Sequence, residues 1–335
     1  MNSRYYENLG AGRKTYDAVL DCLKNHRRGA AVGGQPAVEL LTAVLQEHPE
    51  IFYVAQEFAV SVSLLKREVV PRYLYSASEE ETIRRRLEDT AQEILQECIN
   101  GHQSDYDKIK SLHDYLKVHL EYDTDAAGNR KPKDRRSWEA HNIVGGLLHR
   151  KCVCEGYSKS MKFLCDRIGL ECWVVSGTGS GALEQGPHSW NIVNINGYYH
   201  HVDVTWDHQY AESSNIPNYG YLNLCDEEIA KDHTWNRRHY PVCPSDPYNY
   251  FRVNNSLIDT RAQLETFLYN CFQMEEEYIM FKVVRGSQLE REINGCLQDS
   301  VRRVSGRCRH VSVGNYKYGG IPEQLTFFIQ PEYRY

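Results

Sequence analysis

Cys154 is the residue whose type and position offer the clearest nucleophilic chemistry in this sequence. The apolar residues that follow it recur at the spacing of one helix face: Tyr157, Met161, Leu164, Cys165 and Ile168. Gly169 then stands where a helix C-terminal cap residue is expected. The spacing predicts that Cys154 lies at or just before the first turn, where unpaired N–H groups and the helix dipole favour a thiolate and could stabilise an oxyanion. The alternative is a buried structural cysteine, because free Cys is among the most buried residue types.

A predicted β-hairpin follows this helix. The segment from His188 to Asn194 alternates, and Asn196-Gly197 is a strong signal for a two-residue turn. We expect Tyr198 to Trp206 to form the return strand. A two-residue turn pairs Ile195 with Tyr198, and this register determines every other pair in the hairpin.

In this register His188 faces Thr205, and Asp203 faces Trp190. His188 and Asp203 then lie on the same face of the sheet as diagonal neighbours, about 7–8 Å apart. A carboxylate at that place can accept the imidazole N–H, determine the tautomer and stabilise the imidazolium. Two alternatives remain open: a lone histidine on a strand is usually structural, and a register slip of one residue would put the pair on opposite faces.

Three motifs around these residues closely resemble those of the bacterial transglutaminase-like superfamily. They are Val153-Cys154-Glu155-Gly156-Tyr157, His188-Ser189-Trp190-Asn191 and His201-Val202-Asp203-Val204-Thr205-Trp206-Asp207. Further segments resemble the family's flanking regions: Glu139-Ala140-His141 to Leu148, Asp226-Glu227-Glu228-Ile229 and Asp232-His233-Thr234-Trp235. The specific match covers about Asp105 to Trp235. The resemblance implies a papain-like fold with Cys154 as nucleophile, His188 as base and Asp203 as its orienting partner.

The sequence departs from the family pattern at Cys152, where a glycine commonly stands. This second thiol could form a mixed disulfide, and packing is our default interpretation. A second oxyanion donor is not evident, and Trp138 and His141 are the upstream candidates.

Two other kinds of site can be compared with this one. A zinc site could be drawn from Cys152, Cys154, Cys165, Cys172 and His188, but the paired C-x2–4-C spacing is lacking. The glycine-rich run from Ser176 to Gly181 is superficially like a phosphate loop, but it lacks the following Lys-Ser/Thr and leads into a strand. We interpret the glycine-rich run as a mobile loop beside a cleft. For the protein as a whole we expect no metal and no cofactor.

The chain of 335 residues is long enough for two or three domains. In residues 1–104 we predict helices around Tyr16 to Leu23 and Ala37 to Glu47, and strands between Phe52 and Leu74. Ser78 and Glu81 have the spacing of a capping box that opens a long helix. Its predicted buried stripe is Ile83, Leu87, Ala91, Ile94, Leu95 and Cys98.

Residues 105–246 form the predicted catalytic core. It begins with a helix that has Ile109, Leu112, Leu116 and Leu120 on one face, followed by a polar loop from Asp123 to Arg136.

Residues 247–335 form a predicted small α/β domain to which the sequence assigns no chemistry. Its expected elements are strands at Tyr248 to Val253 and Tyr278 to Val284, helices at Thr260 to Cys271 and Gln288 to Val304, and two final strands near His310 and Thr326 to Gln330. The expected fold class is α+β: a nucleophile-bearing helix packed on an antiparallel sheet, with flanking α/β regions.

Composition limits the kind of partner. The net charge is −6 and the pI is near 6.2, so nothing indicates a nucleic-acid partner. The basic clusters at Arg84-Arg85-Arg86 and from Arg130 to Arg136 are mixed with acidic residues and are interpreted as solvated faces. No apolar stretch has the length of a signal peptide or a membrane span, and eleven scattered cysteines fit reduced thiols. We expect a cytoplasmic protein with no membrane partner; its oligomeric state is left open.

The leading hypothesis is a thiol enzyme that acts on an amide bond of a protein or peptide substrate through a thioester. Peptidase or amidase activity is the first choice, and protein-glutamine transglutaminase activity is the second. The alternative from another class is a non-catalytic binding or scaffold protein that keeps the fold.

Overall fold

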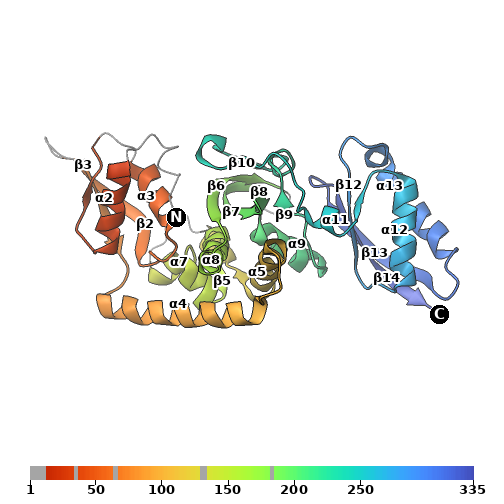
Figure 1. Cartoon of the computed structure of the whole chain (residues 1–335), viewed down its shortest axis with the longest axis horizontal. Coiled ribbons are helices and arrows are strands. Elements are labelled where there is room, and N and C mark those ends of the chain that lie inside the picture. Colours follow the sequence, from red (N-terminus) through yellow and green to blue (C-terminus); the bar gives the residue numbers. More distant parts are fainter. Residues whose placement is uncertain (1–12, 34–36, 63–66, 129–133, 182–184) are drawn as a thin grey trace.

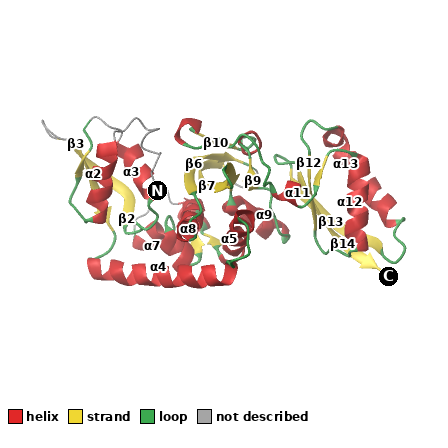
Figure 2. Cartoon of the chain, in the orientation of Figure 1, coloured by secondary structure: helices red, strands yellow, loops and turns green. Residues whose placement is uncertain are grey.

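A computed structural model describes residues 13–33, 37–62, 67–128, 134–181 and 185–335. The chain has an α+β architecture in which helices are combined with mainly antiparallel sheets (Figure 2). Three groups of elements follow one another along the long axis, from the N-terminal part to the C-terminal part (Figure 1). Part of the predicted polar loop from Asp123 to Arg136, and with it part of the basic cluster from Arg130, falls outside the described residues.

The N-terminal part contains the two predicted helices and the predicted strands. The helices are α2 (Arg13–Lys24) and α3 (Ala37–Glu47). A three-stranded antiparallel sheet has the order β1-β3-β2, formed by β1 (Ala30–Ala31), β2 (Val54–Val62) and β3 (Arg67–Tyr73). The two helices form because apolar residues recur at helical spacing, and the strands lie in a segment, Phe52 to Leu74, that is rich in Val, Tyr and Phe.

The long helix α4 (Ala77–Cys98) runs beneath both the N-terminal and the central part (Figure 1). The capping box that opens it is Ser76 with Glu79, so the prediction of Ser78 with Glu81 was wrong by two residues. Both pairs have the required spacing, and the structure uses the earlier one because Ser76 is the residue with extended backbone. The predicted stripe is confirmed: Leu87, Ala91 and Ile94 are buried, and the other three residues pack against the same core.

The central part is built on a five-stranded antiparallel sheet with the order β10-β6-β7-β8-β9. Its strands are β6 (Cys172–Ser180), β7 (Gln185–Ile195), β8 (Tyr198–Val202), β9 (Leu222–Leu224) and β10 (His233–Trp235). A small parallel pair joins β4 (Glu121–Tyr122) to β5 (Lys151–Cys152). The helices are α5 (Asp105–His119), α6 (Thr124–Gly128), α7 (Arg135–Glu139), α8 (Cys154–Arg167), α9 (Val204–Ser214) and α10 (Asp226–Ile229), with a π-helix at Val144–Leu148 and a 3₁₀-helix at Arg237–His239. The predicted loop from Asp123 to Arg136 is therefore partly helical.

The C-terminal part has its own four-stranded sheet with the order β11-β12-β14-β13. The strands are β11 (Leu257–Ile258), β12 (Ile279–Val283), β13 (Ser312–Ile321) and β14 (Thr326–Arg334), and the helices are α11 (Tyr250–Val253), α12 (Arg261–Gln273) and α13 (Gln288–Ser305). The predicted strand at Tyr248 to Val253 was wrong, because Asn249 caps a short helix there by accepting the Phe251 N–H. The other predicted elements of this part are confirmed.

One apolar core is shared by the N-terminal and central parts and includes residues from Tyr16 to Leu222. A second core, from Ile258 to Ile329, lies within the C-terminal part. Among the described residues, no helix is long and apolar enough to cross a membrane. The domain boundaries at 104 and 246 stay predictions.

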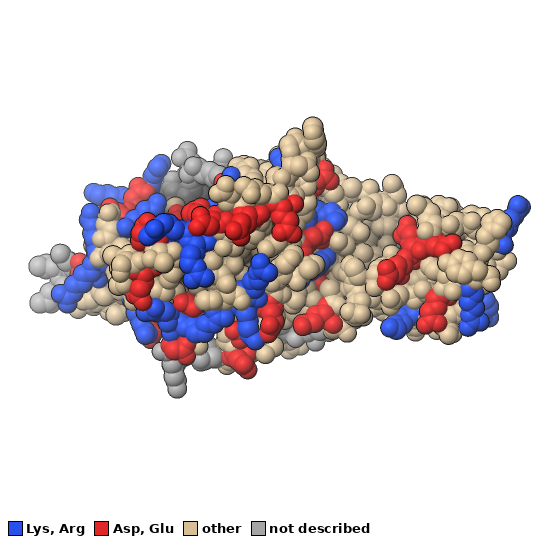
Figure 3. Space-filling model, turned by 90° about the horizontal axis from the view of Figure 1, so that it is seen from below, with Lys and Arg blue, Asp and Glu red and all other residues tan. Residues whose placement is uncertain are grey.

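Lys and Arg side chains are interspersed with Asp and Glu on the face shown in Figure 3. On α4, Arg84 and Arg85 pair with glutamates one turn earlier, Glu80 and Glu81. The Arg85–Glu81 pair is exposed, as on a solvated helix face, whereas Glu80 is buried and Arg84 lies over the Phe52 ring.

Candidate active site

Cys154 is the first residue of α8, as the spacing predicts, and it is half-buried. Val153 is the N-terminal cap residue and has no side-chain hydrogen bond to the first turn. The amides of this turn are therefore not occupied by a capping side chain, which suits an N-terminus that has to face an anion. The helix ends at Arg167 with Ile168 as its C-terminal cap, and Gly169 follows with φ +73°, the left-handed conformation that glycine adopts after a helix.

The hairpin of β7 and β8 has the predicted register over its first five pairs. Ile195 pairs with Tyr198, and Asn191 with Val202. Asn196 and Gly197 both have positive φ, 52° and 89°, as a two-residue turn that matches the twist of the strands requires.

Beyond Val202 the prediction was wrong, because the return strand does not continue to Trp206. Asp203 is instead the N-terminal cap of α9, and its Oδ1 accepts the Trp206 N–H at 3.1 Å. The cross-strand pairs expected for His188 and Asp203 therefore do not form. The chain turns at Asp203 because an aspartate side chain satisfies an N–H at a helix start better than it fits a strand interior.

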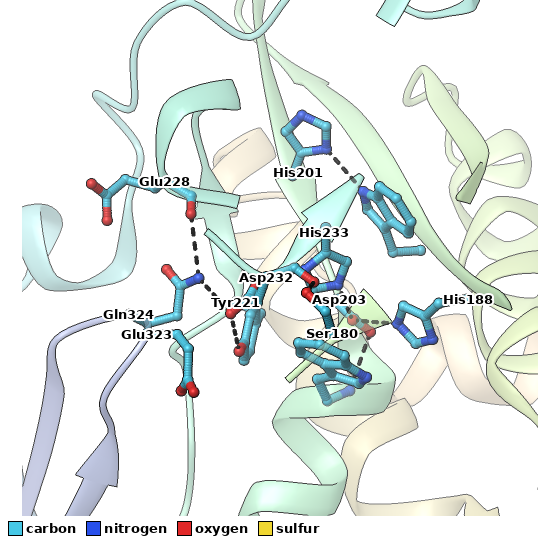
Figure 4. Close-up of polar contacts among 12 residues, drawn as sticks. Ser180, His188, His201, Asp203, Tyr221, Glu228, Asp232, His233, Glu323 and Gln324 are labelled. Atoms are coloured by element: carbon cyan, nitrogen blue, oxygen red, sulfur yellow. Dashed lines mark hydrogen bonds and ion pairs between the residues drawn. The ribbon is translucent and has the colours of Figure 1, made fainter. Parts of the chain in front are cut away.

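His188 and Asp203 are nevertheless in direct contact, since Nε2 of His188 donates to Oδ2 of Asp203 at 2.7 Å. Figure 4 shows the two side chains pointing toward each other, and both are almost fully buried. Because Nε2 faces Asp203, Nδ1 is the ring nitrogen that can exchange a proton with a thiol.

The electrostatics of this pair favour an imidazolium. Burial alone lowers the pKa of His188, but the charge and hydrogen bond of Asp203 outweigh it and, with a smaller contribution from Cys154, raise that pKa to about 10. Burial raises the pKa of Asp203, and the opposing effects of His188 and His233 bring it well below its usual range. Cys154 therefore interacts with a histidine that is kept protonated by a buried carboxylate.

His233 is a neighbour of this pair to which the sequence assigns no role. It lies on β10, and its Nε2 is 3.1 Å from the same Oδ2 of Asp203. Its Nδ1 is 2.6 Å from Oδ1 of Asp232. The signal available in the sequence is the segment Asp232-His233-Thr234-Trp235, which resembles the family's continuation but says nothing of where it packs.

The residues that follow His188 attach β7 to α8. Asn191 donates to the Ser158 carbonyl at 2.9 Å and to the Trp173 carbonyl at 3.1 Å, while the hydroxyls of Ser158 and Ser189 lie 2.9 Å apart. These buried polar contacts couple the helix that begins at Cys154 to the strand that carries His188.

The glycine-rich run from Ser176 to Gly181 is mainly strand β6, so the expectation of a mobile loop was wrong. A Cβ at Gly177 would lie 2.1 Å from the Thr234 carbonyl oxygen, and one at Gly179 would lie 2.6 Å from the Trp206 ring. The glycines are needed because a neighbouring strand and a tryptophan ring approach the backbone closely.

Cys152 is fully buried, and burial raises its pKa well above the usual value. It behaves as a packing residue rather than as a second reactive thiol.

The two upstream candidates for an oxyanion donor have different surroundings. Nδ1 of His141 lies 3.4 Å from Oε2 of Glu155, the residue after the candidate nucleophile. The buried indole N–H of Trp138 has no hydrogen-bond partner among the described residues. Neither observation assigns the role, which stays a prediction.

Among the described residues, two groups of side chains hold His, Asp or Cys atoms within 4.8 Å of one another: His188, Asp203 and His233, and His201, Asp226 and Cys243. In the first, both histidines already donate to Asp203. In the second, the Trp190 indole donates to Nδ1 of His201, so Nε2 carries the proton that faces Asp226. Neither group contains Cys152, Cys154, Cys165 or Cys172, the cysteines from which a zinc site could be drawn. We assign no metal to either group.

Comparison with known proteins agrees with the resemblance. Residues 92–204 match the model of the transglutaminase-like superfamily. Kyphoscoliosis peptidase of Mus musculus is 28% identical over 141 residues, which are 40% of this chain and 20% of that protein. The Homo sapiens protein of the same name is 29% identical over 128 residues, covering 36% and 18%. The chain thus matches about a fifth of the length of these relatives.

A solved transglutaminase structure ("Crystal structure of a TGase") has a TM-score of 0.32 and 17% identity over 48% of this chain and 47% of that one. The family match includes Cys154, His188 and Asp203. Their catalytic roles stay predictions. Residues 92–204, which carry all three candidate site residues, are thus similar to the transglutaminase-like superfamily.

Proposed function

We propose that the protein is a thiol-dependent enzyme that cleaves amide bonds in a protein or peptide substrate through a thioester on Cys154. The observation that carries the proposal is the buried contact of 2.7 Å between His188 and Asp203, on a histidine whose pKa is raised partly by Cys154 itself. A cysteine at a helix start beside a protonated histidine is the environment in which a thiol reacts as a thiolate.

In the acylation step, the Cys154 thiolate attacks the carbonyl carbon and a C–S bond forms, while the π electrons move to the oxygen. The tetrahedral intermediate then collapses, the C–N bond breaks, and the leaving amine takes a proton from the His188 imidazolium. Asp203 does not exchange this proton; it orients the ring and stabilises its charged form.

In the second step, neutral His188 removes a proton from water, and the resulting hydroxide equivalent attacks the thioester. The C–S bond breaks, a carboxylic acid is released, and Cys154 returns as a thiolate beside protonated His188. An amine in place of water would give acyl transfer by the same steps.

Hydrolysis is the preferred outcome because the relatives from mouse and human carry the name peptidase. Neither the superfamily nor the geometry of the three residues selects the acceptor, so the acceptor has to be found by experiment.

The test is mass spectrometry of a panel of unstructured proteins and glutamine-containing peptides, incubated with the enzyme in the presence of a primary amine. Cleaved or deamidated products support hydrolysis, and amine adducts on glutamine support transfer. Cys154→Ala has to abolish whichever activity is found, and Cys152→Ala, as the matched control, has to keep it. An activity that survives in Cys154→Ala refutes the mechanism.

The alternative of a non-catalytic scaffold is tested without a substrate. Iodoacetamide reacts with thiolates, and peptide mapping shows which of the eleven cysteines is modified. Selective modification of Cys154 near neutral pH, lost in His188→Ala, supports an enzyme. Slow and uniform modification of several cysteines supports the scaffold.

A further inference from the structure

The turn between β13 and β14 connects the C-terminal part to the candidate active site. Gln324 lies in this turn and is fully buried. Its side-chain N–H group donates to Oδ2 of Asp232 at 2.9 Å and to the Glu228 carbonyl at 3.3 Å. Figure 4 shows Gln324 entering from the C-terminal hairpin and pointing toward Asp232.

The orientation of the Gln324 amide follows from its neighbours. Oε1 is 3.5 Å from the Lys282 ammonium, which can only donate, while Nε2 faces two oxygens that can only accept. A rotated amide would place an oxygen against the Asp232 carboxylate. Lys282 is itself held by Glu228 at 2.8 Å. Gln324 is therefore a hydrogen-bond donor to Asp232.

The contact belongs to a packed interface between the two parts. Ile321, three residues before Gln324, is buried in one cluster with Trp206, Tyr221, Leu224 and Ile229 of the central part. Trp206 is also the residue whose backbone N–H is capped by Asp203. The hairpin is thus packed against the same helix start that positions the Asp203 carboxylate.

From Asp232 a chain of hydrogen bonds leads to His188. Asp232 Oδ2 also accepts the Tyr221 hydroxyl at 2.7 Å, and its Oδ1 faces Nδ1 of His233 at 2.6 Å. His233 continues to Asp203, which continues to His188.

Because His233 faces a carboxylate oxygen with each nitrogen, both contacts are hydrogen bonds only when the ring carries two protons, or when one of the carboxyls carries the second. Burial opposes a charged ring, but the hydrogen bonds and charges of Asp203 and Asp232 raise the pKa of His233 above its usual value.

We propose that Gln324 makes the C-terminal part a positioning element of the active site: it holds Asp232 as the acceptor for His233, and His233 in turn holds Asp203 in place against His188. Gln324 is a positioning residue, since it contacts neither the thiol nor any reacting atom. This inference rests on the proposed function, because it concerns the reactivity of Cys154.

The test replaces Gln324 by a glutamate and follows the rate at which iodoacetamide modifies Cys154 between about pH 5 and 9. The carboxyl that Gln324→Glu introduces can donate to Asp232 as the amide does while it is protonated. Once ionised it repels Asp232. The Asp232 carboxylate delays this ionisation, while the Lys282 ammonium on the other oxygen favours it. The other charged or titratable groups at this place are Tyr221, His233, Lys282, Glu228 and Arg285, and all are unchanged in the variant.

We expect Gln324→Glu to match the wild type at low pH and to fall about fivefold below it at high pH, the equivalent of one lost hydrogen bond. Gln324→Ala should be slower over the whole range. Gln330→Glu is the matched control, because it makes the same change on strand β14 of the same hairpin, and it should follow the wild type. A purely structural role predicts no additional pH-dependent step in Gln324→Glu.

Equal profiles for the wild type, Gln324→Glu and Gln324→Ala would overturn the inference while leaving the proposed function intact. Failure of the wild type to react selectively at Cys154 would overturn both. If Gln324→Glu does not fold, Tyr221→Phe is the fallback variant, because it removes the other hydrogen bond on the same Asp232 oxygen. Unchanged rates of Cys154 modification in both Tyr221→Phe and Gln324→Ala would refute the inference.

Discussion

His200 provides the most direct quantitative test of the central part. It lies on β8 and is fully buried, and neither of its ring nitrogens has a hydrogen-bond partner among the described residues. Its ring packs edge-on against Tyr248, with the centroids 5.7 Å apart. Burial lowers the pKa of His200 to about 4, against a small opposing effect of Asp246 and a small supporting effect of His201. Within the part of the chain that the structure describes, a second ring proton on His200 would therefore have no acceptor, and the histidine is kept neutral.

The consequence for stability follows from proton binding. The unfolded chain takes up a proton near the usual histidine pKa of about 6.5, and the folded chain only near 4, so stability falls as the pH falls through this window. At 1.36 kcal/mol per pKa unit, about 2 kcal/mol is lost between pH 7 and pH 5, and about 3 kcal/mol in all below pH 4.

His200→Phe keeps the ring packing and removes the titration. We compare the free energy of unfolding of this variant with that of the wild type at two pH values. We expect the difference, variant minus wild type, to be about 2 kcal/mol larger at pH 5 than at pH 7. The assay is urea denaturation followed by tryptophan fluorescence, since all five tryptophans lie between Trp138 and Trp235 and report on the central part. His102→Phe, at an exposed position, is the matched control and should keep the pH dependence of the wild type. If the difference between His200→Phe and the wild type is the same at both pH values, the reasoning is refuted.

Two further predictions concern the surroundings of Cys154. Asp203→Asn keeps an oxygen for the Trp206 N–H but removes the charge that raises the pKa of His188. The rate of Cys154 modification by iodoacetamide at neutral pH should fall at least about a hundredfold. A rate within about twofold of the wild type would contradict the role of Asp203 as the orienting partner of His188. Lys159→Met removes the buried partner 2.8 Å from partly buried Glu155, whose pKa of about 2 is maintained against desolvation by Lys159 and His141. We expect a loss of about 3 kcal/mol in urea denaturation at neutral pH. Lys159→Arg should recover most of that loss, and equal stability of Lys159→Met and the wild type would show that the ion pair contributes nothing.

Local sequence signals were sufficient where the structure depends on neighbours in the chain. The apolar spacing after Cys154 predicted α8 with its start and its end, because helix periodicity and a C-terminal glycine are local properties. The Asn196-Gly197 turn predicted the hairpin register for the same reason. The prediction failed at Asp203, where continued alternation to Trp206 indicated a strand but the capping preference of aspartate prevailed.

The contacts of His233 and Gln324 could not have been predicted from local patterns. His233 is 30 residues from Asp203 in sequence, and Gln324 is 92 residues from Asp232. No periodicity extends over such distances, and nothing in the sequence around either residue distinguishes it from an ordinary polar residue of a strand or turn. Only the folded chain brings β10 and the β13–β14 turn to the same carboxylates.

Asp203 is both the residue at which the predicted strand ends and the residue that contacts the His188 imidazole. A strand that continued to Trp206 would leave Asp203 with no helix N-terminus to cap. By starting α9, Asp203 gives Oδ1 to the Trp206 N–H and leaves Oδ2 to be shared by His188 and His233. The cap determines the rotation of the carboxylate, and the rotation determines which oxygen faces the imidazole. Substitutions that loosen the start of α9 should therefore lower the reactivity of Cys154, even though they contact neither Cys154 nor His188.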